Sequence, residues 1–148
     1  MRLISEDALA VVTIMQEAAG EPYVGKVAVA EVIRNRMRMK YSSDGTVAGT
    51  VLRAKQFSGW NTADPGRIRN IRADDDDAVV RECMRAWEEA KHGSDTVANA
   101  VLYYNKKLVP DTPEWALPES AIHVATVGQH DFFIPKTGPK NRHMSSKV

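Results

Sequence analysis

Two apolar-faced segments, residues 6–19 and 22–39, limit the possible folds of this chain, and the sequence Gly-Glu-Pro separates them. Both segments repeat apolar residues at three- and four-residue steps, which is the spacing of one face of an α-helix. Ser5 precedes two acids and is a typical N-cap, whereas Gly20 is typical of a helix end and Pro22 of a first helical turn. We therefore expect two buried helices joined by a tight corner.

The rest of the chain predicts further helices followed by a small sheet. Thr46 can cap a short helix, and a later amphipathic helix with apolar positions at Cys83 and Trp87 is expected to end near His92. Three short segments favour β-strands: 98–104, 122–127 and 130–134. We therefore expect an α+β fold that is mostly helical, with a small antiparallel sheet late in the chain.

The chain length of 148 residues fits one domain, at 1–135, followed by a flexible tail at 136–148 that is rich in Lys, Ser, Gly and Pro. The single cysteine, Cys83, cannot form an internal disulfide and is expected to be a buried apolar residue. The N-terminus does not resemble a signal peptide, and no apolar run reaches the length of a membrane span. We therefore expect synthesis in a cytoplasm and no stable membrane association. The net charge of +1 indicates no particular partner.

Glu17 is the first candidate for chemistry, because it places a carboxyl group within an apolar helical run. Burial among apolar groups raises the pKa of a carboxyl group, so that it can donate a proton near neutral pH. Cleavage of a glycosidic bond requires such a donor, which then takes a proton back. The alternative is a surface residue on the polar side of the helix, and Glu21 can equally serve the dipole of the next helix.

Aromatic residues and amides occur together at several places in the chain. Sugar rings offer apolar faces for stacking and polar rims for amide side chains, so this mixture suits a carbohydrate groove. Each group taken alone fits the core better, and the repetition favours a groove. The groups are Gln56, Phe57, Trp60 and Asn61; Tyr103, Tyr104 and Asn105; Trp115; and His130 with Phe132 and Phe133.

Other chemistries have weaker support. The consecutive aspartates 74–77 lack the ligand spacing of a calcium loop and are interpreted as the N-terminal cap of the next helix. The histidines have no metal-ligand spacing, so we expect neither a metal ion nor a cofactor. The arginines could contact nucleic acid, but their alternation with apolar residues favours a solvated face. They are Arg34, Arg36 and Arg38, then Arg67, Arg69 and Arg72.

Several motifs, in the right order, resemble one family. The stretch Glu17-Ala-Ala-Gly-Glu-Pro-Tyr-Val-Gly25, with the apolar helix that ends in Asn-Arg36, resembles the opening motif of the SleB-like cell-wall hydrolases, the spore-cortex-lytic enzyme type. Gln56-Phe-Ser-Gly-Trp60 resembles the Gln-Phe-Ser-x-Trp element of that family. The family's later elements are similar to Tyr103-Tyr-Asn105, Pro113-Glu-Trp-Ala116 and Gly128-Gln-His-Asp-Phe-Phe133. Gln16, Ala19 and Lys55 depart from the usual Gly, Arg and Gly, so the charges near Glu17 are expected to differ.

The resemblance implies a lysozyme-like fold that acts on peptidoglycan, with residues 1–135 as the catalytic domain. It implies that Glu17 protonates the oxygen between N-acetylmuramic acid and N-acetylglucosamine. Glu17 then deprotonates the muramyl 6-hydroxyl, which gives a 1,6-anhydro product, as in a lytic transglycosylase. A hydrolytic muramidase of the same fold is the alternative. The residues expected to bind substrate are Glu21, Gln56, Phe57, Ser58, Trp60, Tyr103, Tyr104, Asn105, Trp115 and His130.

These observations predict a monomeric enzyme that acts on peptidoglycan glycan strands without nucleic acid, metal ion or cofactor. The combination resembles a bacteriophage endolysin, made in the host cytoplasm and acting on the cell wall or periplasmic peptidoglycan after release, and a virion-associated lysin is the alternative. Two other classes stay open: a non-catalytic peptidoglycan-binding protein, and a nucleic-acid binder whose affinity would fall steeply with salt.

Overall fold

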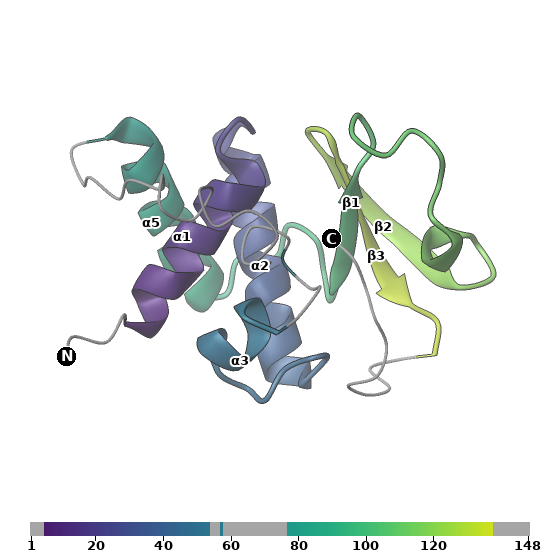
Figure 1. Ribbon diagram of the computed structural model, residues 1–148, viewed down its shortest axis with the longest axis horizontal. Helices are drawn as coiled ribbons and strands as arrows, with labels where there is room; N and C mark the ends of the chain where they lie inside the picture. Colours follow the sequence, from purple (N-terminus) through teal and green to yellow (C-terminus); the bar gives the residue numbers. More distant parts are fainter. Residues whose placement is uncertain (1–4, 54–56, 58–76, 138–148) are drawn as a thin grey trace.

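The computed structural model describes residues 5–53, 57 and 77–137, and in this part of the chain the α-helices form one side of the molecule and a small sheet forms the other (Figure 1). The predicted α+β fold, mostly helical with a small antiparallel sheet, is confirmed. The elements, in chain order, are α1 (Glu6–Ala18), α2 (Tyr23–Met39), α3 (Val47–Val51), α5 (Ala78–Lys91), β1 (Leu102–Asn105), the 3-10 helix η2 (Glu114–Ala116), β2 (Ala121–Val127) and β3 (His130–Pro135).

Side-chain caps begin α1, α3 and α5 where the sequence predicts. At the start of α3, the Thr46 hydroxyl accepts a hydrogen bond from the amide of Gly49 (2.9 Å). The Ser5 hydroxyl accepts a hydrogen bond from the amide of Ala8 (3.1 Å) at the start of α1. The Asp77 carboxylate accepts from the amide of Val79 (2.7 Å) at the start of α5. Each bond satisfies an amide that has no partner within its helix. The predicted cap is thus confirmed for Asp77, while residues 74–76 lie outside the described residues.

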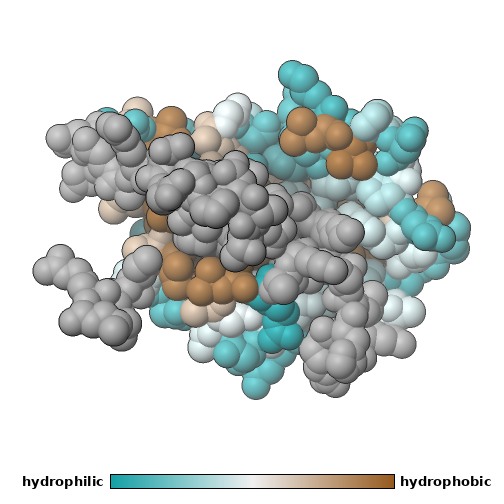
Figure 2. Space-filling view, in the orientation of Figure 1, coloured by the Kyte–Doolittle hydropathy of each residue, from teal (hydrophilic) through white to brown (hydrophobic). Residues whose placement is uncertain are grey.

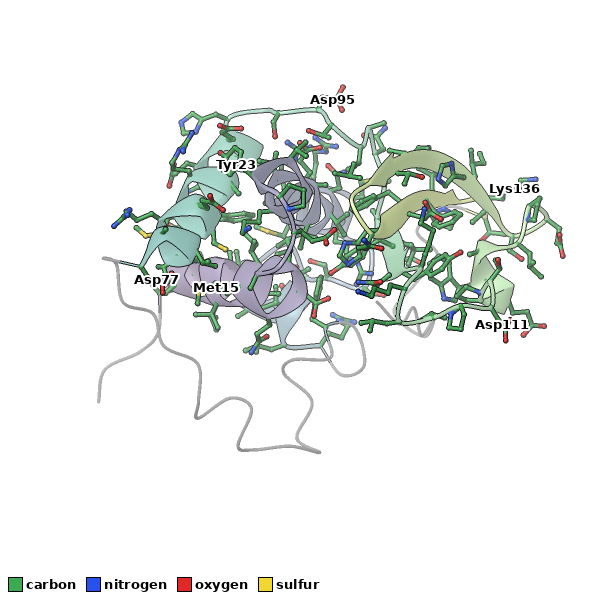
Figure 3. All side chains as sticks on the ribbon, turned by 90° about the horizontal axis from the view of Figure 1, so that it is seen from above. Met15, Tyr23, Asp77, Asp95, Asp111 and Lys136 are labelled. Atoms are coloured by element: carbon green, nitrogen blue, oxygen red, sulfur yellow. The ribbon has the colours of Figure 1, made fainter. Side chains whose placement is uncertain are left out.

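The central helix of the helical side is α2. Its residues from Gly25 to Ile33 are all buried, and α1, α3 and α5 pack against it. Figure 3 shows Tyr23, at the start of α2, beside α5, where the Arg85 guanidinium lies 4.8 Å from its ring centroid. A helix that is apolar and covered on all sides packs against every neighbouring element. The position of α2 therefore sets where the other elements place their side chains.

The two faces of the sheet differ. The strands are antiparallel, in the order β1-β3-β2, and residues paired across neighbouring strands lie on the same face. Tyr103 pairs with Phe132, and both belong to the core that the helices form. Leu102 pairs with Phe133, and both belong to a separate apolar cluster. We call the first face the inner face and the second the outer face.

β1 is shorter than predicted, because it begins at Leu102 and not at residue 98. The side-chain amide of Asn35 donates hydrogen bonds to the carbonyls of Ala98 and Ala100, each at 2.9 Å. Ala98 also has a φ of 52°, which is left-handed and not extended. These carbonyls bind a helix side chain instead of a neighbouring strand, so the strand cannot start earlier.

The prediction that Arg34, Arg36 and Arg38 form a solvated face was wrong for Arg36. Arg38 is exposed and Arg34 is half-buried, but Arg36 is completely buried. The Nε of Arg36 donates a hydrogen bond to the carbonyl of Val101 (2.7 Å). The segment that leads into β1 therefore covers a part of α2 that the sequence pattern alone assigned to solvent. The arginines at 67, 69 and 72 lie outside the described residues.

Apolar residues of the described chain lie both in the core and at the surface. Cys83 is buried as predicted, and burial raises the pKa of its thiol to about 11. On the face shown in Figure 2, hydrophobic atoms of the described residues occur in separate small groups. None of the described helices is both long and apolar enough to cross a bilayer.

Candidate active site

Glu17 lies in the last turn of α1 and is half-buried. Its Oε1 accepts a hydrogen bond from the hydroxyl of Tyr103, with 2.6 Å between the two oxygens. Tyr103 belongs to the inner face of the sheet and is only 1% exposed. The bond therefore joins the helical side of the molecule to the sheet at the residue for which the sequence predicts acid and base chemistry.

Tyr103 keeps its proton under ordinary conditions. Burial, and then the charge of Glu17, raise the pKa of Tyr103 well above its usual value of 10. A hydroxyl that stays protonated is a permanent donor, and a short bond from such a donor to a carboxylate is strong and directional. Tyr103 thus fixes the orientation of the Glu17 carboxyl group and stabilises it when it is ionised.

His130 contacts Tyr103 on the inner face. The two rings meet edge to face, with 5.0 Å between their centroids and 85° between their planes. The Nδ1 of His130 lies 3.2 Å from Oε1 of Glu21, and since a carboxylate only accepts, we assign the proton to this nitrogen. Burial lowers the pKa of His130, although Glu21 acts in the opposite direction. A neutral imidazole that donates to Glu21 is therefore the form at neutral pH.

Glu21 connects the corner between α1 and α2 to the hairpin between β2 and β3. Besides His130, its Oε1 accepts a hydrogen bond from the amide of Gln129 (2.9 Å). Gly128 is required beside it for two reasons: its φ is 59°, and a Cβ at this position would lie 2.3 Å from Oε1 of Glu21. Glu21 was predicted to bind substrate. In the structure its carboxylate binds the Gln129 amide and the His130 ring.

Four predicted site residues thus form one connected chain: Glu17, Tyr103, His130 and Glu21. The sequence predicted each of them but not how they connect, because they come from three separate parts of the chain. Gly128 was not predicted as a site residue. Its signal in the sequence is a glycine directly before Gln129-His130, between two predicted strands, where a turn needs a positive φ.

Other predicted residues lie on the outer face, away from this chain. Tyr104 and Trp115 pack with Phe133, whose ring stacks on Tyr104 at 5.8 Å and meets Trp115 edge to face at 5.4 Å. The structure therefore does not bring Tyr104 or Trp115 together with Glu17. Asn105, at the end of β1, pairs instead with His130 of the inner face. Its side-chain oxygen accepts from the amide of Lys107 (2.9 Å), which holds the following turn.

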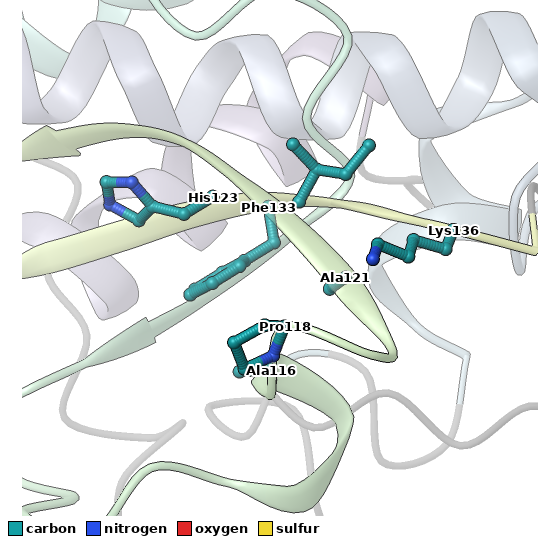
Figure 4. A pocket seen from close by; sticks show the side chains of 7 residues that line it. Ala116, Pro118, Ala121, His123, Phe133 and Lys136 are labelled. Carbon is teal, nitrogen blue, oxygen red and sulfur yellow. The ribbon is translucent and has the colours of Figure 1, made fainter.

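The outer face also carries an apolar hollow of about 300 Å³ (Figure 4). In Figure 4, the side chain of Lys136 extends towards Ala121. Seven residues line the hollow: Ala116, Pro118, Ala121, Ile122, His123, Phe133 and Lys136. The hollow shares Phe133 with the aromatic cluster of that face, and neither Glu17 nor Tyr103 lines it.

The first aromatic group is described only at Phe57. This side chain is completely buried, and the Arg36 guanidinium lies 5.1 Å from its ring centroid. Its ring consequently has no face open to a sugar in this structure. Gln56, Ser58 and Trp60, also predicted to bind substrate, lie outside the described residues. Within the described part of the chain, no cluster of three acidic, histidine or cysteine side chains could hold a metal ion.

The sequence profile of the family described as Cell Wall Hydrolase matches residues 20–133. Glu21, Tyr103 and His130 lie inside the matched stretch, and Glu17 lies just before it. Among curated proteins, the spore cortex-lytic enzymes of Bacillus cereus and Halalkalibacterium halodurans are 30% and 34% identical over 116 residues, which is 78% of this chain. The aligned stretch is only 39% and 31% of those proteins, so the chain spans less than half of their length.

Two solved structures are similar. One is the catalytic domain of the germination-specific lytic transglycosylase SleB from Bacillus anthracis, with a TM-score of 0.66 and 26% identity over 88% of this chain and 96% of that one. The other is the catalytic domain of the Bacillus cereus SleB protein, with the same score and identity over 90% of this chain and 94% of that one. The described fold is thus that of these catalytic domains.

Proposed function

Because the chain belongs to the cell wall hydrolase family, we propose that it is an enzyme that cleaves the β-1,4 bond between N-acetylmuramic acid and N-acetylglucosamine in peptidoglycan. Glu17 is its general acid and base. The observation that carries this proposal is the 2.6 Å hydrogen bond from the Tyr103 hydroxyl to the Glu17 carboxyl group. A half-buried acid that a permanently protonated donor holds in place has the preorganisation that proton transfer needs.

In the first half of the reaction, the Glu17 carboxyl group gives its proton to the glycosidic oxygen. The bond between that oxygen and C1 of N-acetylmuramic acid then breaks, and N-acetylglucosamine leaves as an alcohol. Glu17 is left as a carboxylate. The Tyr103 hydroxyl stabilises this anion directly, since it donates to Oε1.

In the second half, the Glu17 carboxylate takes the proton of the 6-hydroxyl of N-acetylmuramic acid. The 6-oxygen attacks C1, and a 1,6-anhydro ring closes on the same sugar. One carboxyl group suffices for this lytic transglycosylase route, because no water has to be activated. The similarity to a catalytic domain named as a lytic transglycosylase supports this route over hydrolysis.

Clearing of purified peptidoglycan by the wild-type protein and by Glu17→Gln tests the proposal. Glutamine keeps the shape of the side chain but cannot exchange a proton, and general acid–base catalysis contributes about 10²- to 10⁴-fold. We expect a loss of that order. The matched control is Glu119→Gln, at an exposed position, which should clear at the wild-type rate. Clearing by Glu17→Gln at the wild-type rate would remove Glu17 from the mechanism.

Mass spectrometry of the released muropeptides decides the route. Anhydro ends without the mass of an added water identify a lytic transglycosylase, and reducing ends identify a muramidase. Wild-type protein that binds peptidoglycan but releases nothing would support the non-catalytic alternative.

The expectation of a bacteriophage endolysin remains a prediction about the biological setting. Expression in a bacterial host, with and without a separate protein that permeabilises the membrane, tests it. An endolysin lyses the cells only when both proteins are present.

A further inference from the structure

The side chain of Asn35, near the end of α2, has a hydrogen-bond partner for each of its donors and acceptors. It is completely buried, and its side-chain amide donates to the carbonyls of Ala98 and Ala100. Its oxygen accepts from Arg34 (2.9 Å) and Arg38 (3.0 Å). An asparagine side chain offers two donor hydrogens and one acceptor oxygen with two lone pairs, so none is left over. Asn35 therefore holds the backbone before β1 in one position.

Arg36 binds the next part of the same segment. Its Nε donates to the carbonyl of Val101 at 2.7 Å. The guanidinium lies 5.1 Å from the ring centroid of Phe57 and 5.8 Å from that of Tyr41, distances at which a cation is attracted to an aromatic ring. Val101 is two residues before Tyr103 in the chain. The anchor thus acts immediately before the residue that contacts Glu17.

Arg36 also brings a positive charge into the interior behind that contact. Burial lowers the pKa of Arg36 to about 10, and the Glu17 carboxyl group acts against this shift. A buried charge is costly unless opposite charge or hydrogen-bond acceptors surround it. The Val101 carbonyl is one such acceptor.

We propose that Asn35 and Arg36 are positioning residues, which fix the segment from Ala98 to Val101 so that the Tyr103 hydroxyl meets the Glu17 carboxyl group. Three carbonyls of this short segment bind side chains of α2. Glu17 is set from the same helix, since its own helix is joined to α2 by the corner at Glu21, whose carbonyl accepts from Lys26 of α2. Both partners of the contact are therefore placed relative to α2. This inference rests on the proposed function, which assigns the chemistry to Glu17.

A double-mutant cycle tests the proposal. We expect Arg36→Met to lower kcat roughly tenfold or more with little change in KM, since misplacement by about 1 Å can cost about 10²-fold. In a Tyr103→Phe background, the same substitution should change kcat by less than about twofold, because the hydroxyl that it positions is already absent. Equal losses of kcat in both backgrounds would overturn the proposal, since a purely structural role would not depend on Tyr103.

Two further variants keep the test valid if Arg36→Met does not fold. Arg36→Lys retains the charge, and Asn35→Ser removes the side-chain amide that binds the carbonyls. The kcat of each variant should lie between that of the wild type and that expected for Arg36→Met. Val32→Ala, a completely buried position on α2, is the control for loss of stability alone. Its kcat should stay at the wild-type value once the protein is folded.

A readout that is independent of activity separates this proposal from the proposed function. The ¹³Cζ resonance of Tyr103 reports on its hydroxyl hydrogen bond. It should move in Arg36→Lys and Asn35→Ser and stay in place in Val32→Ala. Unchanged resonances in both variants would overturn the positioning role, whether or not the wild-type protein clears peptidoglycan. A shifted resonance in a protein that clears nothing would support the positioning role and reject the proposed function.

Discussion

The inner and outer faces of the same three-stranded sheet are stabilised by different interactions. On the inner face, Tyr103 and His130 are buried polar groups that bind Glu17 and Glu21 on the helical side. On the outer face, Tyr104 and Phe133 pack against each other and Trp115. A buried polar group must keep its partner, whereas an apolar cluster depends on packing and area. Activity should therefore depend on the inner face, and stability on both faces.

The largest effect on stability is expected on the outer face, for Phe133→Ala. Removing a buried phenylalanine costs about 3–5 kcal/mol in the free energy of unfolding, and Phe133 is 5% exposed at the centre of its cluster. Denaturant unfolding measures the loss. The fraction that stays folded should clear peptidoglycan at the wild-type rate per molecule. A lower rate per folded molecule would show that activity also depends on the outer face.

The next effect is expected on the inner face, for Tyr103→Phe. This change removes the hydrogen bond to Glu17 but leaves the ring in place, and a bond to a charged group contributes about 1.5–3 kcal/mol. We expect kcat to fall by about tenfold or more, a larger change in activity than any outer-face variant gives once it is folded. Tyr104→Phe is the matched control in the neighbouring residue of β1. Equal kcat values for the two variants would contradict the assignment of the inner face.

Gly128→Ala should have a smaller effect on stability. A left-handed φ costs a residue with a Cβ about 1–2 kcal/mol, and the new Cβ would force Oε1 of Glu21 to move. Unfolding experiments measure the cost, and NMR measures the change at His130. Gly93→Ala, with a φ of 99° and open space around it, is the control for backbone strain without contact with Glu21. The His130 resonances should shift only in Gly128→Ala.

The smallest effect is a dependence of stability on pH. Burial lowers the pKa of His130 below its ordinary 6.5, so the unfolded chain takes up a proton at a higher pH than the folded chain. This residue therefore lowers the free energy of unfolding as the pH falls from 6.5 towards its folded-state pKa. His130→Asn should remove this component, and His92→Asn, at an exposed position, should retain it. Denaturant unfolding at a series of pH values measures both. Equal pH profiles for wild type and His130→Asn would contradict the neutral, buried imidazole.

Much of the architecture followed from local patterns. The caps at Ser5 and Asp77 and the break at Gly-Glu-Pro depend on side chains within a few residues of the backbone that they affect. Such signals act over short distances and can be read from the chain. Arg36 and the start of β1 were predicted wrongly for the opposite reason, since α2 meets the segment from Ala98 to Val101 only in the folded protein.

Local sequence patterns were enough to predict the candidate residues: a carboxylate in an apolar helix, a tyrosine on a strand and a histidine that follows a glycine. That Tyr103 contacts Glu17 while its neighbour Tyr104 packs on the outer face follows from the three-dimensional fold. Successive strand residues point to opposite faces, so adjacent positions in the sequence enter different environments. Which face meets the helices depends on packing between segments far apart in the chain, and no local pattern contains that information.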